Sequence, residues 1–342
     1  MPGTVHISTS AVHTFQRRFG TAELRRAVGA ANLYLVSRRP RTRLELRTTR
    51  NPWQRRERVM VQVGNAWYEM GNVGIDQLGV SPDGRYFKGL VAERPVHGEA
   101  WALATVISGA LDFSKHEILY VGKSEDVEAR LAKHATLQRI YEDHSTSDWD
   151  IFVTPLLIEQ TYLTNDDHID DDGSRVHDEA IFNLMDALGG RARGRASRTA
   201  ISLAEHAMIT YFCPEYNRQL RSWNAQKKTP EMELLWRAGH HLAVVMVQGA
   251  FELAAFFGAG RVPRRVHVIA AEVPANPRLK GFGAISLSEV EVPDVAEGLR
   301  MLVESSKEAQ DMYEASPALL TIFGEAPADS VPSDLNDWLA KG

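Results

Sequence analysis

The sequence predicts a mixed α+β protein whose centre is a small three-stranded antiparallel sheet flanked by helices, with additional α+β domains on both sides. Short runs of β-branched and aromatic residues alternate with turn signals in the N-terminal part. Strand-like and helix-like segments then alternate along the rest of the chain. A length of 342 residues suffices for two or three domains. We expect them at 1–100, 101–224 and 225–342.

Residues 1–100 are predicted to form an arginine-rich α+β accessory domain. A helix is expected over Ala22–Ala31, because apolar residues recur there with helical spacing. Gly64-Asn65 has the composition of a hairpin turn. The expected strands are Leu33–Val36, Leu44–Thr48, Val59–Val63 and Trp67–Glu69.

The charge of the chain is unevenly distributed. Residues 1–60 contain thirteen arginines and three glutamates, with neither lysine nor aspartate, so this segment carries +10 while the whole chain carries −5. Such asymmetry indicates a part that contacts a polyanion such as nucleic acid. The alternative is a solvated basic face in a chain that prefers arginine to lysine, 30 to 9.

The central region, 101–224, is expected to fold as one domain with insertions at 164–198. Trp101–Ser108 is rich in apolar and β-favouring residues, and we expect it to form a hairpin with Ile118–Val121. Ser124 is followed by two acidic residues and is expected to begin a helix. The remaining expected elements are a strand at Asp150–Leu157 and helices at Ala180–Leu188 and Ser202–Phe212.

Residues 225–342 are expected to form an acidic α+β domain, which we consider as a possible surface for a protein partner. Its most apolar stretch, His241–Phe257, is interpreted as a buried helix, because it is short for a bilayer span and contains polar residues. Strands are expected near Val266–Val273 and Ile285–Val292, and a helix near Val295–Ala315.

The cysteine content and the lack of a recognisable secretory signal indicate the compartment in which the protein is expected. Cys213 is the single cysteine, so an intramolecular disulfide framework and a cysteine-rich zinc site are excluded. No secretory signal is recognisable. We therefore expect a cytoplasmic protein without a membrane partner. The sequence does not indicate an oligomeric state.

Five polar residues of the central region occur at intervals that suggest one site. Tyr120 lies at the end of an expected strand, and Arg130 and His134 follow with the four-residue spacing that brings two side chains to one helix face. Glu205 lies in a later helix, and Asn217 follows Pro214.

This set of residues suits the hydrolysis of a phosphodiester. A fixed guanidinium stabilises the charge that gathers on the phosphoryl oxygens in the transition state. Mg²⁺ or Mn²⁺ needs only one or two carboxylates besides phosphate and water, so Glu205 alone suffices as a metal ligand. His134 or Tyr120 can transfer protons or orient water, and Lys123 can hold a phosphate as a point charge.

The order of these residues resembles the GIY-YIG nuclease superfamily. The matching features are a strand ending in Tyr-Val-Gly, a helix with Arg-x-x-x-His, a later glutamate, and a Pro-x-x-Asn sequence. The resemblance implies that Tyr120, Arg130, His134, Glu205 and Asn217 are catalytic and that Glu205 binds the metal. It covers the central third of the chain and implies a metal-dependent endonuclease that acts on nucleic acid, with DNA expected.

The chain departs from the family at the first strand. Ala104-Thr105-Val106 stands where the family has Gly-Ile-Tyr, so the first tyrosine is expected to be missing. The interval from His134 to Glu205 is longer than is usual in the family. An additional loop within it contains Arg191, Arg193 and Arg195, which we expect to contact nucleic acid.

Two other functions remain open at this point. A nucleic-acid-binding protein that keeps the fold but has impaired catalysis is favoured by the expected loss of the first tyrosine. A partner-regulated effector is the second alternative. Each residue also has a structural interpretation, the sharpest being that Ser202 and Glu205 form a capping box at a helix N-terminus.

Overall fold

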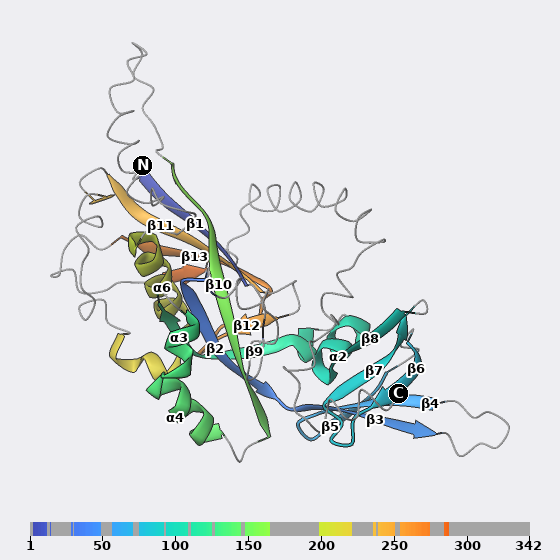
Figure 1. Ribbon diagram of the computed structural model, residues 1–342. Helices are drawn as coiled ribbons and strands as arrows, with labels where there is room; N and C mark the ends of the chain where they lie inside the picture. The colour runs from blue at the N-terminus through green and yellow to red at the C-terminus, as the bar shows by residue number, and fades with distance from the viewer. Residues whose placement is uncertain are drawn as a thin grey trace, which may run out of the picture.

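The computed structural model describes the greater part of the chain up to residue 286. The described residues are 3–11, 14, 29, 31–48, 57–70, 75–91, 94–108, 111–124, 127–144, 148–164, 198–220, 235–236, 239–249, 254–273 and 284–286. Strands outnumber helices in these ranges, and both are present (Figure 1). The expected mixed α+β class is confirmed at this level. None of the helices in the described parts of the chain has the length and apolarity that a bilayer span requires.

One eight-stranded sheet forms the body of the molecule. Its strand order is β12-β9-β2-β10-β1-β11-β13-β14. The strands are β1 (Gly3–Ala11), β2 (Leu33–Pro40), β9 (Lys115–Lys123), β10 (Trp149–Thr164), β11 (His240–Gln248), β12 (Ala255–Phe257), β13 (Val266–Glu272) and β14 (Ala284–Ser286). Neighbours are antiparallel except β1 with β11 and β12 with β9, which are parallel.

The sheet therefore takes strands from all three expected domains. β1 and β2 come from 1–100, β9 and β10 from 101–224, and β11 to β14 from 225–342. The expected three-stranded central sheet exists only as the neighbours β9, β2 and β10 within this larger sheet. Hydrogen bonding between the strands thus continues across residues 100 and 224.

Helices cover both faces of the sheet near β2, whose side chains alternate between the two. Leu33 and Leu35 pack in a cluster with helix α6 (Arg198–Phe212). Tyr34 and Val36 pack in another cluster with residues of α3 (Val127–Ala132) and α4 (Ala135–His144). Alternation along a strand sends successive side chains to opposite faces, so β2 is buried on both sides.

Residues 42–114 form a smaller module between two adjacent strands of the main sheet. It contains the sheets β3-β4-β5 and β6-β7-β8, helix α2 and a 3-10 helix, η1. The bounds are β3 (Thr42–Thr48), β4 (Glu57–Val63), β5 (Ala66–Met70), β6 (Asp76–Val80), β7 (Tyr86–Val91), β8 (Arg94–Glu99), α2 (Ala100–Ser108) and η1 (Leu111–Ser114). A separate apolar cluster, with Leu44, Val61, Phe87 and Leu103 at its centre, forms its core.

A polar junction joins this module to the main sheet. Arg39, only 1% exposed, donates a hydrogen bond from Nη2 to Thr42 Oγ1 (2.7 Å), and its guanidinium lies 5.0 Å from the Trp101 ring centroid. The Asp150 carboxylate accepts hydrogen bonds from Arg85 (2.8 Å) and Arg41 (3.3 Å). Burial lowers the pKa of Arg39 to about 10, while Asp150 opposes that shift, so the guanidinium stays charged at neutral pH.

Two expected elements are wrong. Trp101–Ser108 belongs to helix α2, where Thr105 Oγ1 donates to the Trp101 carbonyl one turn back. Apolar runs of this length do not distinguish a buried strand from a buried helix. His241–Phe257 is not a helix: β11 and β12 occupy most of it, and burial along β11 alternates for much of its length.

Other expectations are confirmed or lie outside the described residues. Strands occur near every position expected before residue 70, and also at Asp150–Leu157 and Val266–Val273. The expected strand at Ile285–Val292 is described only as β14. The helices expected at Ala180–Leu188 and Val295–Ala315 lie outside the described ranges, as does most of Ala22–Ala31.

Gly258 allows the chain after β12 to approach the end of α6, and this contact provides a test of the packing. A Cβ added at Gly258 would lie 2.1 Å from the Phe212 carbonyl oxygen. We expect Gly258→Ala to lower the free energy of unfolding by about 1–3 kcal/mol, measured by chemical denaturation. Ala259→Ser, at an exposed neighbouring position, should change it by less than about 0.5 kcal/mol. Equal stability of the two variants would contradict this packing.

Candidate active site

The strand that pairs with the Tyr120 strand contains a tyrosine. β9 pairs with β2, so that Tyr120 lies opposite Val36 and Gly122 lies opposite Tyr34. The expected first strand at Ala104-Thr105-Val106 is therefore wrong, since those residues are helical. Tyr34 was missed because the module of residues 42–114 separates β2 from β9 in the sequence. The available signal was the Asn-Leu-Tyr-Leu-Val segment at the start of β2.

Tyr34 and Tyr120 lie side by side on the face of the sheet that α3 and α4 cover. Their ring centroids are 6.0 Å apart, and both residues belong to the same apolar cluster. Gly122 makes this approach possible, because an added Cβ would lie 2.4 Å from Tyr34 Cζ and 2.7 Å from Tyr120 Cε1. The glycine of the Tyr-Val-Gly sequence is thus required by the two rings.

His134 completes a group of three rings. Its imidazole lies 5.1 Å from the Tyr120 ring and 6.0 Å from the Tyr34 ring, edge-on in both cases. The expectation that it shares a helix face with Arg130 is wrong: His134 lies between α3 and α4, and its Nδ1 accepts a hydrogen bond from the Leu137 amide (3.0 Å). His134 thereby caps α4. Its buried Nε2 has no hydrogen-bond partner.

Arg130 is exposed at the end of α3 and acts on all three rings through its charge. Burial lowers the pKa of His134, and Arg130 lowers it further. Burial raises the pKa of Tyr34, and Tyr120 raises it as well, whereas Arg130 opposes the shift. The pKa of Tyr120 is also raised, first by burial and then by the charge of Glu205. His134 is therefore neutral at physiological pH, and Arg130 favours ionisation of both phenols.

Glu205 is buried within α6 and paired with Lys123. Glu205 Oε2 lies 2.8 Å from Lys123 Nζ, and the same ammonium donates to Ser202 Oγ (2.9 Å). The carboxylate side chain is 8% exposed and the lysine side chain 41%. Burial raises the pKa of Glu205, while Lys123 lowers it. Because α6 begins at Arg198, the capping-box interpretation of Ser202 and Glu205 is wrong.

Asn217 fixes the strand rather than facing the rings. Its Oδ1 accepts a hydrogen bond from the Val121 amide (2.8 Å), and its Nδ2 donates to the Val121 carbonyl (2.9 Å). The Asn217 amide thus satisfies both backbone hydrogen-bonding groups of Val121, the residue after Tyr120, in the way that a neighbouring strand does. Asn217 is 1% exposed. We assign it as a positioning residue for Tyr120 and Gly122.

The structure therefore brings together most of the expected residues, in two groups linked by β9. Tyr34, Tyr120, His134 and Arg130 form one group, and Lys123 with Glu205 forms the other. The effect of Glu205 on the pKa of Tyr120 connects them. The expected phosphate-binding residues of the additional loop, Arg191, Arg193 and Arg195, lie outside the described ranges.

Only one of these site residues carries a carboxylate that could bind a metal. Within the described residues, no group of three or more histidine, cysteine, aspartate or glutamate side chains could hold a metal ion. Glu205 therefore suits a metal that takes most of its ligands from phosphate and water, as Mg²⁺ does. In this structure Oε2 of that carboxylate is engaged by Lys123.

Comparisons of the chain with protein-family models, with curated proteins and with solved structures found no match. The interpretation of the site therefore depends on the residues and their geometry.

The close approach of Gly122 to Tyr34 makes a testable prediction. We expect Gly122→Ala to destabilise the protein by about 1–3 kcal/mol, because Tyr34 is fully buried and its ring cannot move aside freely. Denaturant unfolding should show that the cost becomes smaller in a Tyr34→Ala background, which removes the opposing ring. Additive effects in this double-mutant cycle would contradict the proposed contact.

Proposed function

We propose that the protein is a metal-dependent endonuclease that hydrolyses phosphodiester bonds in nucleic acid, with DNA as the expected substrate. The observation that supports this most is the pairing of β2 with β9. It sets Tyr34 beside Tyr120, close to His134 and within the electrostatic reach of Arg130. The tyrosine that the resemblance requires is thereby supplied from the N-terminal part of the chain.

Each residue has a role that follows from its surroundings. Arg130 is exposed and cationic, so it stabilises the charge on the phosphoryl oxygens in the transition state. Tyr34 or Tyr120 orients the attacking water through a neutral hydroxyl, because burial raises both phenol pKa values by more than Arg130 lowers them. Neutral His134 holds the start of α4 and lies against both rings.

Glu205 is the expected ligand for a divalent metal, which would neutralise a non-bridging phosphate oxygen and assist departure of the leaving oxygen. In the free protein, the Lys123 ammonium lies against the same carboxylate. A metal bound to the Glu205 carboxylate would lie close to this ammonium, and the two positive charges would repel each other. We therefore propose that the half-exposed Lys123 moves to a substrate phosphate, leaving Glu205 available to the metal.

A nucleic-acid-binding protein without catalysis is the second candidate. The specific observation in its favour is the Lys123–Glu205 ion pair, which satisfies the buried carboxylate without any metal. The presence of Tyr34 removes the earlier argument for this candidate. Control by a partner that binds the acidic C-terminal region stays a third hypothesis.

Cleavage of a mixed substrate panel tests the proposed function. We expect the wild type to cut at least one of plasmid, duplex, single-stranded, branched and RNA substrates with Mg²⁺ or Mn²⁺ and not with EDTA. Glu205→Gln should abolish cutting while binding stays nearly unchanged, and Arg130→Ala should cost about 3 kcal/mol of transition-state stabilisation. Undiminished cutting by Glu205→Gln would exclude our metal ligand; salt-sensitive binding without cutting by wild type would favour the second candidate.

Competition between Lys123 and the metal can be measured without catalysis. We expect Lys123→Met to bind Mn²⁺ more tightly than wild type at pH 8, because the carboxylate loses its competing cation. As the pH falls, the Mn²⁺ affinity of the variant should begin to decline at a higher pH than that of wild type, because Lys123 lowers the pKa of Glu205. Calorimetry or electron paramagnetic resonance of Mn²⁺ measures both effects. Lys133→Met, at another exposed lysine, is the control, and identical behaviour of the two variants would refute the competition.

A further inference from the structure

The sheet β3-β4-β5 of the inserted module has one face that packs on the core of the module, although Tyr68 on that face is exposed, and one open face. Leu44, Val59, Val61 and Met70 point into the core of the module. The register of the three strands places the alternate residues together on the other side. We call this side the outer face; it consists of Arg43, Glu45, Arg47, Arg58, Met60, Gln62, Trp67 and Glu69.

Trp67 is the main apolar group of the outer face. Its side chain is 42% exposed, whereas large apolar side chains in the rest of the described structure are mostly buried. The Arg47 guanidinium lies 4.8 Å from the centroid of the indole ring. Trp67 pairs with Gln62, whereas Arg47 pairs with Arg58 farther along the strands. The two side chains therefore extend across the face toward each other. A flat ring backed by a cation is thus open to solvent.

The arginines of the outer face are held at its surface. Glu45 accepts two hydrogen bonds from Arg47 (2.9 and 2.8 Å), and Glu69 accepts one from Arg58 (2.9 Å). Arg43 is exposed and makes no ion pair with another described residue. The outer face carries three arginines, Arg43, Arg47 and Arg58, against the two glutamates. Its described residues are therefore net positive by one charge and include an aromatic ring.

We propose that the outer face binds single-stranded nucleic acid. An exposed indole stacks on any unpaired base, and arginines around it contact the phosphates of the same strand. The bases of a duplex are stacked on each other and cannot reach a ring that lies along a sheet. An acidic protein could satisfy the arginines, but it offers no regular partner for the indole. The proposal does not depend on cleavage.

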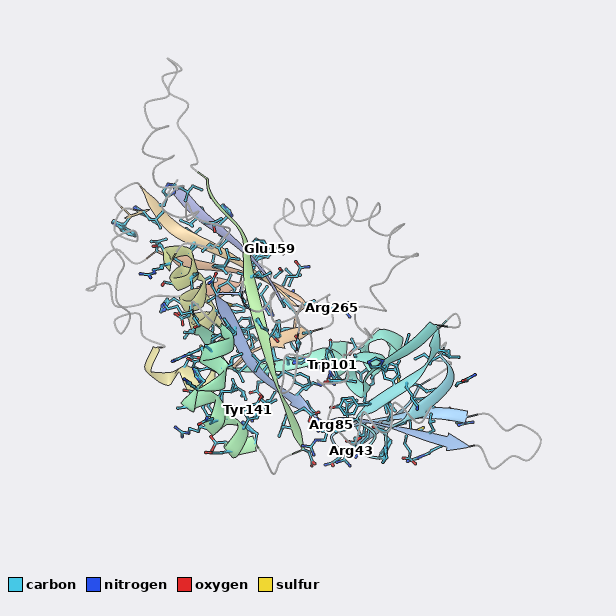
Figure 2. All side chains as sticks on the ribbon, in the orientation of Figure 1. Arg43, Arg85, Trp101, Tyr141, Glu159 and Arg265 are labelled. Carbon is cyan, nitrogen blue, oxygen red and sulfur yellow. The ribbon has the colours of Figure 1, made fainter. Side chains whose placement is uncertain are left out.

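The outer face is separate from the candidate active site. The module lies at one end of the main sheet, and α3, α4 and α6 lie toward the other side (Figure 1). Figure 2 shows Arg43 with the module and Tyr141, a residue of α4, to its left. The face would therefore hold a strand outside the site where Tyr34 and Tyr120 meet.

Binding to labelled oligothymidylate and oligouridylate, measured by fluorescence anisotropy, tests the proposal. The full chain carries Glu205→Gln and the buffer contains EDTA, so that cleavage does not interfere. We expect Trp67→Ala to weaken binding about tenfold, as loss of one stacked base does, and Trp67→Phe to restore most of it. Arg43→Gln should weaken binding less and reduce the slope of log K against log salt by about 0.7.

Two further variants separate this role from a general effect on folding. Val262→Ala, at an exposed apolar residue away from the face, should bind as the parent does. Glu45→Gln should bind a few-fold more tightly at low salt, because it removes a negative charge that repels phosphate. Tighter binding by Glu45→Gln and weaker binding by Trp67→Ala are expected of a binding surface, whereas damage to the fold of the module would weaken binding in both variants.

The outcomes decide between the possible partners. Unchanged binding in Trp67→Ala, or equal affinity for a duplex of the same length, would overturn the proposal. Binding of an acidic polypeptide that depends on Arg43 but not on Trp67 would also overturn it and identify a protein surface. Trp67-dependent binding by a wild type that never cleaves would support this proposal while refuting the endonuclease.

Discussion

Six residue pairs between β2 and β9, from Leu33–Lys123 to Arg38–Glu117, connect two segments that the sequence separates widely. The candidate site depends on this pairing, because Tyr34 and Tyr120 meet only when the two strands are neighbours. Loop-closure entropy grows slowly with length, by about 0.6 kcal/mol for each doubling. An insertion that folds on its own core therefore adds little cost to the pairing. The apolar cluster of residues 42–114, to which β10 of the main sheet contributes Phe152, largely meets this condition.

Burial at the site has opposite consequences for its ionisable groups. The phenols of Tyr34 and Tyr120 and the carboxyl of Glu205 have raised pKa values because burial disfavours their charged forms. Burial lowers the pKa of His134 for the same reason. Each group therefore tends toward its neutral form. Arg130 and Lys123, both more exposed, supply positive charge that opposes this tendency for the acids without reversing it, and any bound metal would act in the same direction.

Strands and turns could be predicted from the sequence where the pattern of neighbouring residues determines them. The order of Tyr120, Arg130, His134 and Glu205 led us to expect them close together, and the structure brings them near one another, although His134 and Arg130 do not share a helix. The strands β3, β4 and β5 could be placed from alternation and from Gly64-Asn65. Local pattern failed at α2, where the run Trp101–Ser108 suits either a strand or a helix.

Tyr34 could not be predicted because the sequence does not show which strands are neighbours. Antiparallel neighbours are commonly joined by a short hairpin, so the local pattern placed the partner of the Tyr120 strand at Trp101–Ser108. The actual partner precedes the whole module. The expected divisions at residues 100 and 224 followed composition, charge and the extent of the resemblance, although strands from all three regions share one sheet. The role of Asn217 was equally hidden, since its two bonds to Val121 join residues far apart in sequence.

The polar junction explains how the module can have a defined position relative to the site. β2 carries Tyr34 near its beginning and Arg39 near its end. Arg39 is enclosed at full charge between Thr42 and Trp101, while Asp150 of β10 binds Arg41 and Arg85 from the module side. Displacing Arg41 and Arg85 from Asp150 would leave its buried carboxylate without ion-pair partners, which is costly. The module is thereby held against the sheet at the same strand that presents Tyr34, so that a nucleic-acid strand on the outer face would have a fixed relation to the two tyrosines.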